Sequence, residues 1–225
     1  EQPDIFLSAA NHITVLMGLF RWMFPRRMLL LARESSLVSS NSQYASQPWL
    51  YRQLLRRCYK PFDHIICQSV AMRNDLVEEF DVPPESTTVL HNPVEAGDTV
   101  PGPAPAGTTF ITVGRLSAEK RVDHILDALA LLDIPFLYFI VGDGEEREKL
   151  ERKVTASGLQ DKVKFRGQQD QPFQGLEGAQ LFLMASSHEG FPNSLLEAGA
   201  LGIPVVACEA PGGIGEIIRE NINGF

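Results

Sequence analysis

The feature that most constrains the fold is a repeated alternation of short apolar runs with longer segments of helical period. The apolar runs are rich in Val, Ile and Phe, which is typical of buried strands. Strands that alternate with helices predict βα units on mostly parallel sheets. We expect strands at residues 5–8, 28–33, 64–69, 87–90, 109–114, 136–142, 163–167, 181–185 and 204–207. This is a large number of strands for one sheet in a chain of 225 residues.

Helical segments are expected between these strands, at residues 13–23, 48–60, 71–80, 118–132, 145–157 and 194–201. One stretch, residues 93–107, has no hydrophobic periodicity and mixes proline with glycine, which is the composition of a linker. We therefore predict two α/β domains, at residues 1–92 and 108–225. Both are expected to be incomplete, because the first begins in mid-pattern and the second stops just after a helix–turn signal.

Composition and charge exclude several classes of protein. The chain is 44% hydrophobic and 21% charged, as in a soluble globular protein, and its net charge of -8 argues against a nucleic-acid surface. Three widely spaced cysteines predict neither a disulfide framework nor a zinc site, and they suit a reducing cytoplasm. The first residues, which lack Met and a basic region, do not resemble a targeting segment.

The charge is unevenly distributed, because basic residues outnumber acidic ones in residues 1–60. An apolar stretch at residues 13–31 lies in this region, but Arg21, Pro25, Arg26 and Arg27 interrupt it, so it is too short to span a bilayer. One hypothesis is peripheral contact with the cytoplasmic face of a membrane. The alternative is a buried helix that carries a few solvated arginines.

The first segment that carries chemistry runs from Ser187 to Ala198, after an expected strand. Asn193 or Ser194 is expected to cap the following helix, whose free N–H groups would form an anion site. Glu189 in the loop and Glu197 in the first turn would face this site. The alternative is that Glu197 only completes a capping box with Ser194, and that Glu189 is a solvated loop residue.

The second segment runs from Gly114 to Lys120, again at a strand-to-helix turn. Ser117 is the expected cap, which places Lys120 and Arg121 in the first helical turn. Cations there oppose the helix dipole, and a bound anion would explain them. The alternative is that Glu119 offsets the charge of two ordinary surface cations.

Weaker signals lie at three other expected strand ends. Gly142 allows a tight turn or a close approach of the backbone to a ligand. Arg166 precedes Gly167 at a strand end, and His12 is expected at the carboxyl edge of the first sheet, where α/β proteins bind ligands. Each position also has an ordinary reading, as a plain loop, a plain strand end or a helix cap.

Taken together, the two segments resemble the large group 1 family of retaining GT-B glycosyltransferases. Glu189 and Glu197 are similar to its signature of two glutamates separated by seven residues, and the turn from Gly114 to Lys120 is similar to its Gly-Arg-Leu turn followed by Glu-Lys. The likeness is strong from about residue 92 onward and only an outline before it. The chain departs from the pattern at Arg121, where glycine is common.

The resemblance implies two Rossmann-like doubly wound domains that face a cleft. It implies that Arg115 and Lys120 neutralise the donor diphosphate, that Glu189 contacts sugar hydroxyls and that Glu197 binds the ribose. It further implies a polar residue, His12, near the donor sugar and the acceptor. The remaining expected contacts to the nucleotide are Ser194, Leu195, Gly142, Arg166, Gly190, Phe191 and Asn193.

The expected function is transfer of a sugar from a nucleotide diphosphate donor, a UDP-sugar in preference to a GDP-sugar, to an acceptor hydroxyl with retention. The acceptor would be a glycan or a lipid-linked molecule in polysaccharide or glycolipid biosynthesis. No cofactor and no metal are expected, since the sequence has no Asp-x-Asp pair. Two alternatives remain open: a sugar-nucleotide epimerase of similar architecture, and a non-catalytic fragment that binds sugar nucleotides.

Overall fold

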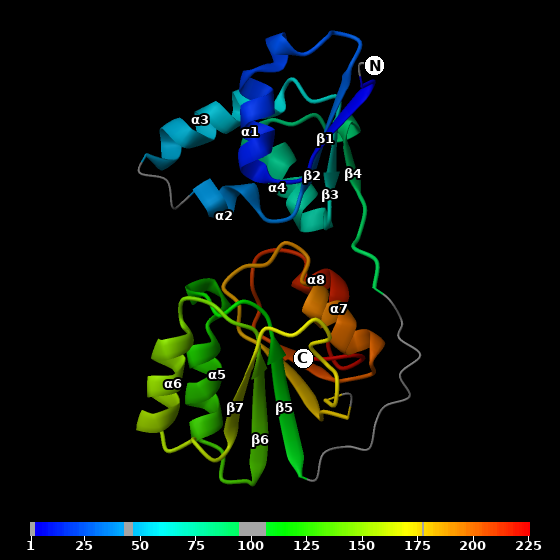
Figure 1. Ribbon diagram of the computed structural model, residues 1–225. Coiled ribbons are helices and arrows are strands. Elements are labelled where there is room, and N and C mark those ends of the chain that lie inside the picture. The colour runs from blue at the N-terminus through cyan, green and yellow to red at the C-terminus, as the bar shows by residue number, and fades with distance from the viewer. Residues whose placement is uncertain (1–2, 43–46, 95–106, 177) are drawn as a thin grey trace. The chain divides into compact units, whose positions relative to one another are not determined.

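The protein is described by a computed structural model, which covers residues 3–42, 47–94, 107–176 and 178–225. The chain forms two compact units (Figure 1). The first unit consists of Glu1–Asn92, His188–Phe191 and Pro211–Glu216, and the second holds the remaining residues. Most of the predicted linker, residues 95–106, lies outside the described residues.

The first unit contains a parallel four-stranded sheet in the order β1-β2-β3-β4. Its strands are β1 (Ile5–Ser8), β2 (Leu29–Glu34), β3 (His64–Cys67) and β4 (Thr87–Val89). Its helices are α1 (Asn11–Leu19), α2 (Val38–Ser42), α3 (Pro48–Tyr59) and α4 (Val70–Phe80). Buried residues of α1, α3 and α4 pack on one face of this sheet to form its core.

Side-chain alternation along β2 decides which of its residues enter this core. Leu30, Ala32 and Glu34 are buried, with at most 1% of each residue exposed, whereas Leu29, whose side chain points to the opposite face of the sheet, is 46% exposed. A carboxyl group at position 34 therefore lies inside the unit, at the carboxyl end of its strand.

The second unit contains a parallel five-stranded sheet in the order β7-β6-β5-β8-β9. Its strands are β5 (Thr108–Val113), β6 (Phe136–Val141), β7 (Val163–Gly167), β8 (Leu181–Met184) and β9 (Val205–Ala207). The helices that follow these strands are α5 (Val122–Ala130), α6 (Arg147–Ala156), α7 (Asn193–Ala200) and the short α8 (Ile214–Ile217). Helices α5 and α6 lie side by side along the sheet (Figure 1).

A buried polar chain crosses the middle of the second sheet. The Tyr138 hydroxyl donates to Thr112 Oγ1 at 2.7 Å, and the Thr112 hydroxyl donates to the Leu183 carbonyl at 2.7 Å. These bonds join β6, β5 and β8, and they satisfy hydroxyl groups that would be costly to bury alone. They also help to fix the alignment of the three strands below the carboxyl edge of the sheet.

The order of the second sheet contains a topological switch point. From the central strand β5, the chain builds β6 and β7 on one side and then returns to add β8 and β9 on the other. In parallel α/β sheets, the turns on either side of such a point diverge and leave a crevice at the carboxyl ends of the strands. The turns after β5 and β8 are therefore placed to bind a ligand.

The nine expected strands are all present, with ends that differ by a residue or two, and they form two sheets. Two expected helices are interrupted. Residues 13–23 form α1 and a separate 3-10 turn, Arg21–Met23, and residues 118–132 form a 3-10 turn, Ala118–Lys120, before α5. The second interruption has a clear backbone cause, because Arg121 adopts a left-handed conformation with φ of 47°.

We predict that Arg121→Gly stabilises the second unit. A non-glycine residue in the left-handed region carries a steric cost that glycine avoids, so we expect a gain of about 1 kcal/mol in the free energy of unfolding. Urea denaturation measures it. As a control of opposite sign, Ala128→Gly on the exposed side of α5 should cost about 1 kcal/mol. An Arg121→Gly variant less stable than the wild type would show that the arginine side chain stabilises this turn.

Candidate functional site

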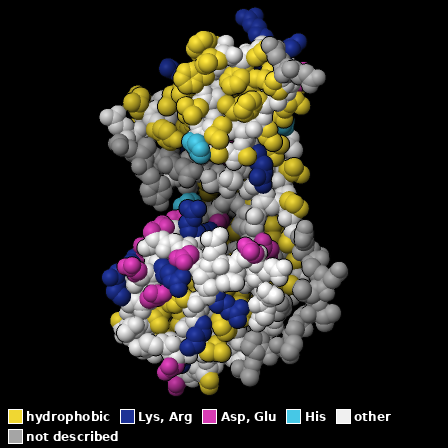
Figure 2. Space-filling model, viewed as in Figure 1, with side chains coloured by type: hydrophobic (Ala, Val, Ile, Leu, Met, Phe, Trp, Pro, Cys, Tyr) yellow, Lys and Arg dark blue, Asp and Glu magenta, His cyan; other side chains and the backbone are white. Residues whose placement is uncertain are grey.

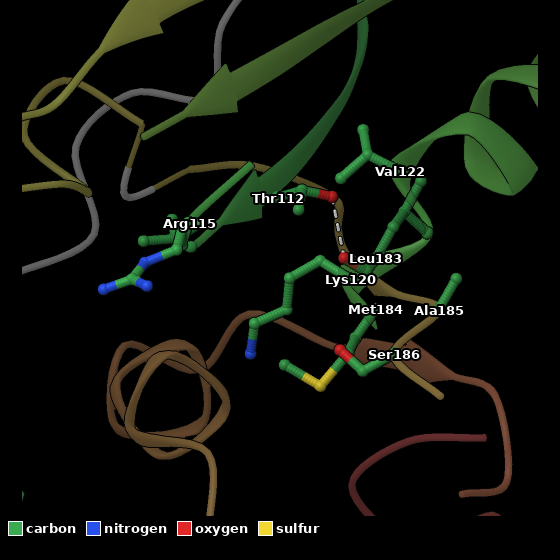
Figure 3. A pocket seen from close by; sticks show the side chains of 10 residues that line it. Thr112, Arg115, Lys120, Val122, Leu183, Met184, Ala185 and Ser186 are labelled. Atoms are coloured by element: carbon green, nitrogen blue, oxygen red, sulfur yellow. Dashed lines mark hydrogen bonds between the residues drawn. The ribbon is translucent and has the colours of Figure 1, made fainter. Parts of the chain in front are cut away.

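Two cationic side chains extend from the turn after β5. Arg115 is exposed and Lys120 is half-buried, and both point to the same side of the turn (Figure 3). Together with Thr112, Met184 and Ser186 they line a small crevice between the ends of β5 and β8. Two positively charged side chains therefore line the crevice at the switch point.

The turn after β5 is held by backbone bonds to the turn after β6. The Leu116 N–H donates to the Asp143 carbonyl at 2.9 Å, and the Leu116 carbonyl accepts the Glu146 N–H at 2.9 Å. The Leu116 side chain is buried in the core, with 1% exposed. This anchoring lets the neighbouring Arg115 project outward from a rigid backbone.

Gly142 is required by this pairing of turns. Its φ is 135°, and a Cβ atom at this position would lie 1.9 Å from the Gly114 carbonyl oxygen. No side chain fits there unless the two turns separate. Gly142 also lines a cavity of about 300 Å³ together with Gly114, Arg115, Asp143, Gln168, Gln169 and Pro172.

The turn after β8 reaches the same place from the other side of β5. The Ser187 N–H donates to the Glu119 carbonyl at 2.8 Å, and the Ser187 hydroxyl donates to the same oxygen at 3.3 Å. These bonds lock the start of the loop after β8 against the 3-10 turn that carries Lys120. Residues that are about 70 positions apart in the chain, Lys120 and Ser186, therefore line one crevice.

Arg166 is placed beside the cavity, but its side chain has a structural task. Its Nη1 donates to the Gln174 carbonyl at 3.0 Å, and its guanidinium carbon lies 4.9 Å from the centre of the Phe139 ring. The Arg166 carbonyl accepts Nε2 of Gln169 at 2.9 Å. The groups that face the cavity are those of Gln168 and Gln169, which the sequence analysis missed. Their position just after the end of β7 is the signal that points to them.

Helix α7 begins one residue earlier than the motif suggested. Its cap is Pro192, and no side chain forms a capping bond, so neither Asn193 nor Ser194 is the N-cap. The Leu195 N–H is bonded to the Pro192 carbonyl at 3.2 Å and is not available as an open donor. Ser194 is in the first turn, where N–H groups have no partner within the helix.

Glu197 is therefore not part of a capping box. It is the fifth residue of α7, one turn inside the helix, and it is half-buried. Burial raises the pKa of its carboxyl group above the ordinary value. A ligand that donates hydrogen bonds to this carboxylate would favour its charged form and offset the cost of burial.

The other expected site residues belong to the first unit. Glu189 is 9% exposed, and its N–H donates to the Pro211 carbonyl at 3.0 Å. The Phe191 ring stacks on His91 with centroids 4.7 Å apart, and a Cβ atom on Gly190 would meet the Ser35 carbonyl at 2.2 Å. His12 is exposed in the first turn of α1.

The described residues include no cluster of three or more His, Cys, Asp or Glu side chains arranged to hold a metal ion. Within the same part of the chain, no helix combines the length and the hydropathy needed to cross a membrane.

Family models match both parts of the chain. Residues 101–225 match the model described as glycosyl transferases group 1, and residues 2–97 match the model described as glycosyltransferase family 4. The chain belongs to the group 1 family of glycosyl transferases, as the two motifs predicted.

Curated relatives include the lipopolysaccharide 1,6-galactosyltransferase of Escherichia coli K12. It is 38% identical over 149 residues, which cover 62% of this chain and 42% of that protein. The lipopolysaccharide core biosynthesis glycosyltransferase LpsE of Rhizobium meliloti is 28% identical over 216 residues, covering 94% of this chain and 57% of that protein. The chain thus spans about half the length of these relatives.

Solved structures with the same fold include HepE of Anabaena in complex with UDP. It matches with a TM-score of 0.82 and 22% identity, over 99% of this chain and 64% of HepE. The galactosyltransferase WaaB matches with a TM-score of 0.77 and 24% identity, over 99% of this chain and 61% of WaaB. These likenesses confirm the predicted GT-B-type α/β fold.

Proposed function

We propose that the chain belongs to a glycosyltransferase that moves a sugar from a nucleotide diphosphate donor to an acceptor hydroxyl, with retention, in glycan or glycolipid biosynthesis. The observation that carries the proposal is the pair Arg115 and Lys120 at the switch point of the second sheet. Names of its relatives support it, because they are transferases that act in lipopolysaccharide synthesis.

Arg115 and Lys120 would bind the donor diphosphate. Arginine offers a planar fork of donors and lysine a compact charge, so the two can bridge both phosphates. Negative charge grows on the diphosphate as the bond to the sugar breaks. Cations held on a rigid turn stabilise this charge without reorganising, which is the main way in which such a site would accelerate transfer.

The remainder of the nucleotide would extend from this turn along the carboxyl edge of the sheet. The cavity beside Gly142, Gln168 and Gln169 suits a base, and the half-buried Glu197 suits the hydroxyls of a ribose. Asn193 and Ser194 at the start of α7 would contact phosphate. We favour UDP over GDP, since HepE was solved with UDP and with UDP-glucose.

Glu189 and His12 keep the roles that the family resemblance implies, at the donor sugar and near the acceptor, and Gly190 and Phe191 stay beside Glu189. The acceptor would be a glycan or a lipid-linked glycan, as in relatives named for lipopolysaccharide and for a diphospho-undecaprenol. We place the protein in the cytoplasm, where its three free thiols would stay reduced.

An apolar surface on the first unit supports peripheral membrane contact. Leu16 is 53% exposed, Trp22 78% and Met23 64%, and the exposed Arg26 follows them. Hydrophobic side chains gather over this part of the first unit in Figure 2. Arg21 does not contribute, because its guanidinium donates to the carbonyls of Phe24, Pro25, Arg26 and Met28.

We predict that the chain binds UDP and UDP-sugars, and that Arg115→Ala and Lys120→Ala in the complete enzyme lower kcat at least tenfold. A tenfold loss corresponds to about 1.4 kcal/mol of transition-state stabilisation. A thermal-shift panel of UDP-, GDP- and ADP-sugars identifies the donor, and steady-state transfer assays measure kcat. Arg152→Ala, an exposed cation on α6, is the matched control and should change neither quantity.

Near-normal kcat and unchanged nucleotide affinity in both variants would show that the turn is only a surface loop. Conversion of the donor sugar without any acceptor would favour the epimerase alternative. Nucleotide binding without turnover of any acceptor by the complete enzyme would favour the non-catalytic alternative.

We further predict that Glu197→Gln weakens UDP binding at least tenfold with little change in fold. The amide is nearly isosteric, but it lacks the charge and one of the two acceptor oxygens that ribose hydroxyls would use. Isothermal titration calorimetry with UDP measures the effect, and Glu148→Gln on the exposed side of α6 is the control. Full UDP affinity in Glu197→Gln would remove the ribose role.

For the membrane, we predict that the protein floats with anionic liposomes at low salt and that a Trp22→Ser, Met23→Ser double variant does not. Trp and Met bury apolar area at the lipid surface, while nearby arginines attract anionic headgroups. Leu131→Ser in the second unit, where Leu131 is 86% exposed, is the control. Absence of wild-type flotation at low salt, where screening is weakest, would end this idea.

A further inference from the structure

A carboxyl group is buried at the carboxyl edge of the first sheet, outside the proposed donor site. Glu34, the last residue of β2, is 1% exposed. None of the ion pairs recorded among the described residues includes it. A buried carboxyl without a cation is costly unless hydrogen bonds satisfy its oxygens.

The hydrogen bonds that satisfy Glu34 come from two other elements. The hydroxyl of Tyr59, at the end of α3, donates to Glu34 Oε1 at 3.0 Å. The same hydroxyl oxygen accepts Nδ2 of Asn11, the first residue of α1, at 3.0 Å. Burial raises the pKa of Tyr59 far above its ordinary value, so the phenol keeps the proton that it donates.

The direction of these bonds fixes the orientation of the Asn11 amide. Burial raises the pKa of the Glu34 carboxyl above its ordinary value, and hydrogen bonding from Tyr59, Thr14 and Asn11 opposes that rise. The amide nitrogen therefore faces the buried Tyr59 hydroxyl on the inner side, and only nitrogen carries protons in this group. The amide oxygen, Oδ1, is left for the outer side.

Asn11 lies where its outward amide oxygen could accept a hydrogen bond from a ligand. It follows the end of β1 at the edge where α/β sheets bind ligands, it is half-buried, and the exposed His12 is next to it. The cap of α1 is Ala10, without a side-chain capping bond, so Asn11 is not used as a cap.

We propose that Asn11 determines acceptor specificity, with Oδ1 accepting a hydrogen bond from a hydroxyl of a sugar acceptor, and that Tyr59 and Glu34 are positioning residues that hold Oδ1 outward. This inference rests on the proposed function and names the chemistry of its acceptor side. An amide oxygen binds hydroxyl or amine donors. It repels phosphate and carboxylate, so the group recognised here is an uncharged sugar hydroxyl.

Each positioning residue has a distinct part. Tyr59→Phe removes the oxygen that accepts one amide proton, so the Asn11 side chain loses the bond that prevents it from flipping. Glu34→Gln replaces a carboxyl oxygen, which accepts hydrogen bonds, by an NH₂ group, which only donates them. This change weakens the acceptor that holds the Tyr59 hydroxyl, and through it the inward Asn11 nitrogen. Neither change alters the volume of the core much.

The test uses the complete enzyme with UDP-galactose as donor and deacylated lipopolysaccharide core oligosaccharide as acceptor. Asn11→Ala, Tyr59→Phe and Glu34→Gln should each raise the acceptor KM about tenfold, as the loss of one hydrogen bond of about 1.4 kcal/mol implies. UDP affinity should stay within about twofold of the wild type, a change worth less than such a bond.

The double variant Asn11→Ala, Tyr59→Phe should have an acceptor KM no higher than that of Asn11→Ala, because Tyr59 acts through Asn11. Tyr51→Phe, on the same helix but without a hydrogen bond to Asn11 or Glu34, is the matched control.

A second measurement reads the orientation directly. In NMR spectra of the ¹⁵N-labelled chain, the Asn11 side-chain NH₂ protons should exchange with water more slowly than those of the exposed Asn74, and Tyr59→Phe should remove the difference. The oligosaccharide should shift the Asn11 signals.

Equal exchange rates at Asn11 and Asn74, or unchanged acceptor KM in all three variants, would overturn the inference. A wild type that binds UDP while the oligosaccharide is neither glycosylated nor shifts the Asn11 signals would also overturn it, and the donor site would stand. A wild type that does not bind UDP would overturn the proposed function as well.

Discussion

The close backbone contact between the turns after β5 and β6 is the constraint on which the proposed donor site depends. Gly142 can approach the Gly114 carbonyl only because it has no side chain, and this approach lets Leu116 bond to the neighbouring turn. Arg115 therefore projects from a backbone that is fixed on both sides. A cation on a mobile loop would lose most of its value, because electrostatic stabilisation of a growing charge requires groups that are already in place.

The same region contains a non-glycine residue with an unfavourable backbone conformation. Arg121 takes a left-handed conformation that ends the 3-10 turn and starts α5 in a new direction. This break moves Lys120 out of the helix and into the turn, beside the crevice that Ser186 also lines. Strain of this kind is commonly found beside functional sites, where geometry matters more than stability.

The first unit solves a different physical problem. Its buried carboxyl, Glu34, is satisfied by neutral donors from α1 and α3. An amide oxygen at this edge accepts hydrogen bonds from hydroxyls and disfavours anions. The proposed donor site is thus built on cations, and the proposed acceptor contact on uncharged hydrogen-bonding groups.

Sequence alone determined the strands, because short apolar runs between polar turns have few other ways to bury their side chains, and it determined the family through two motifs whose spacing is specific as a pair. The sequence also predicted Arg115, Lys120 and Glu197 as candidate site residues. It placed the start of α7 and the course of residues 118–132 wrongly. Pro192 as a cap and the left-handed Arg121 depend on the neighbouring backbone and not on local propensity.

Only the tertiary structure decided that Gln168 and Gln169 face the cavity and that the Arg166 side chain is bound to Gln174 and Phe139. It also decided that Glu34 is buried with Tyr59 and Asn11. These facts depend on the order of strands and on contacts between residues far apart in the chain, and a sequence pattern carries no record of which distant side chain becomes a neighbour.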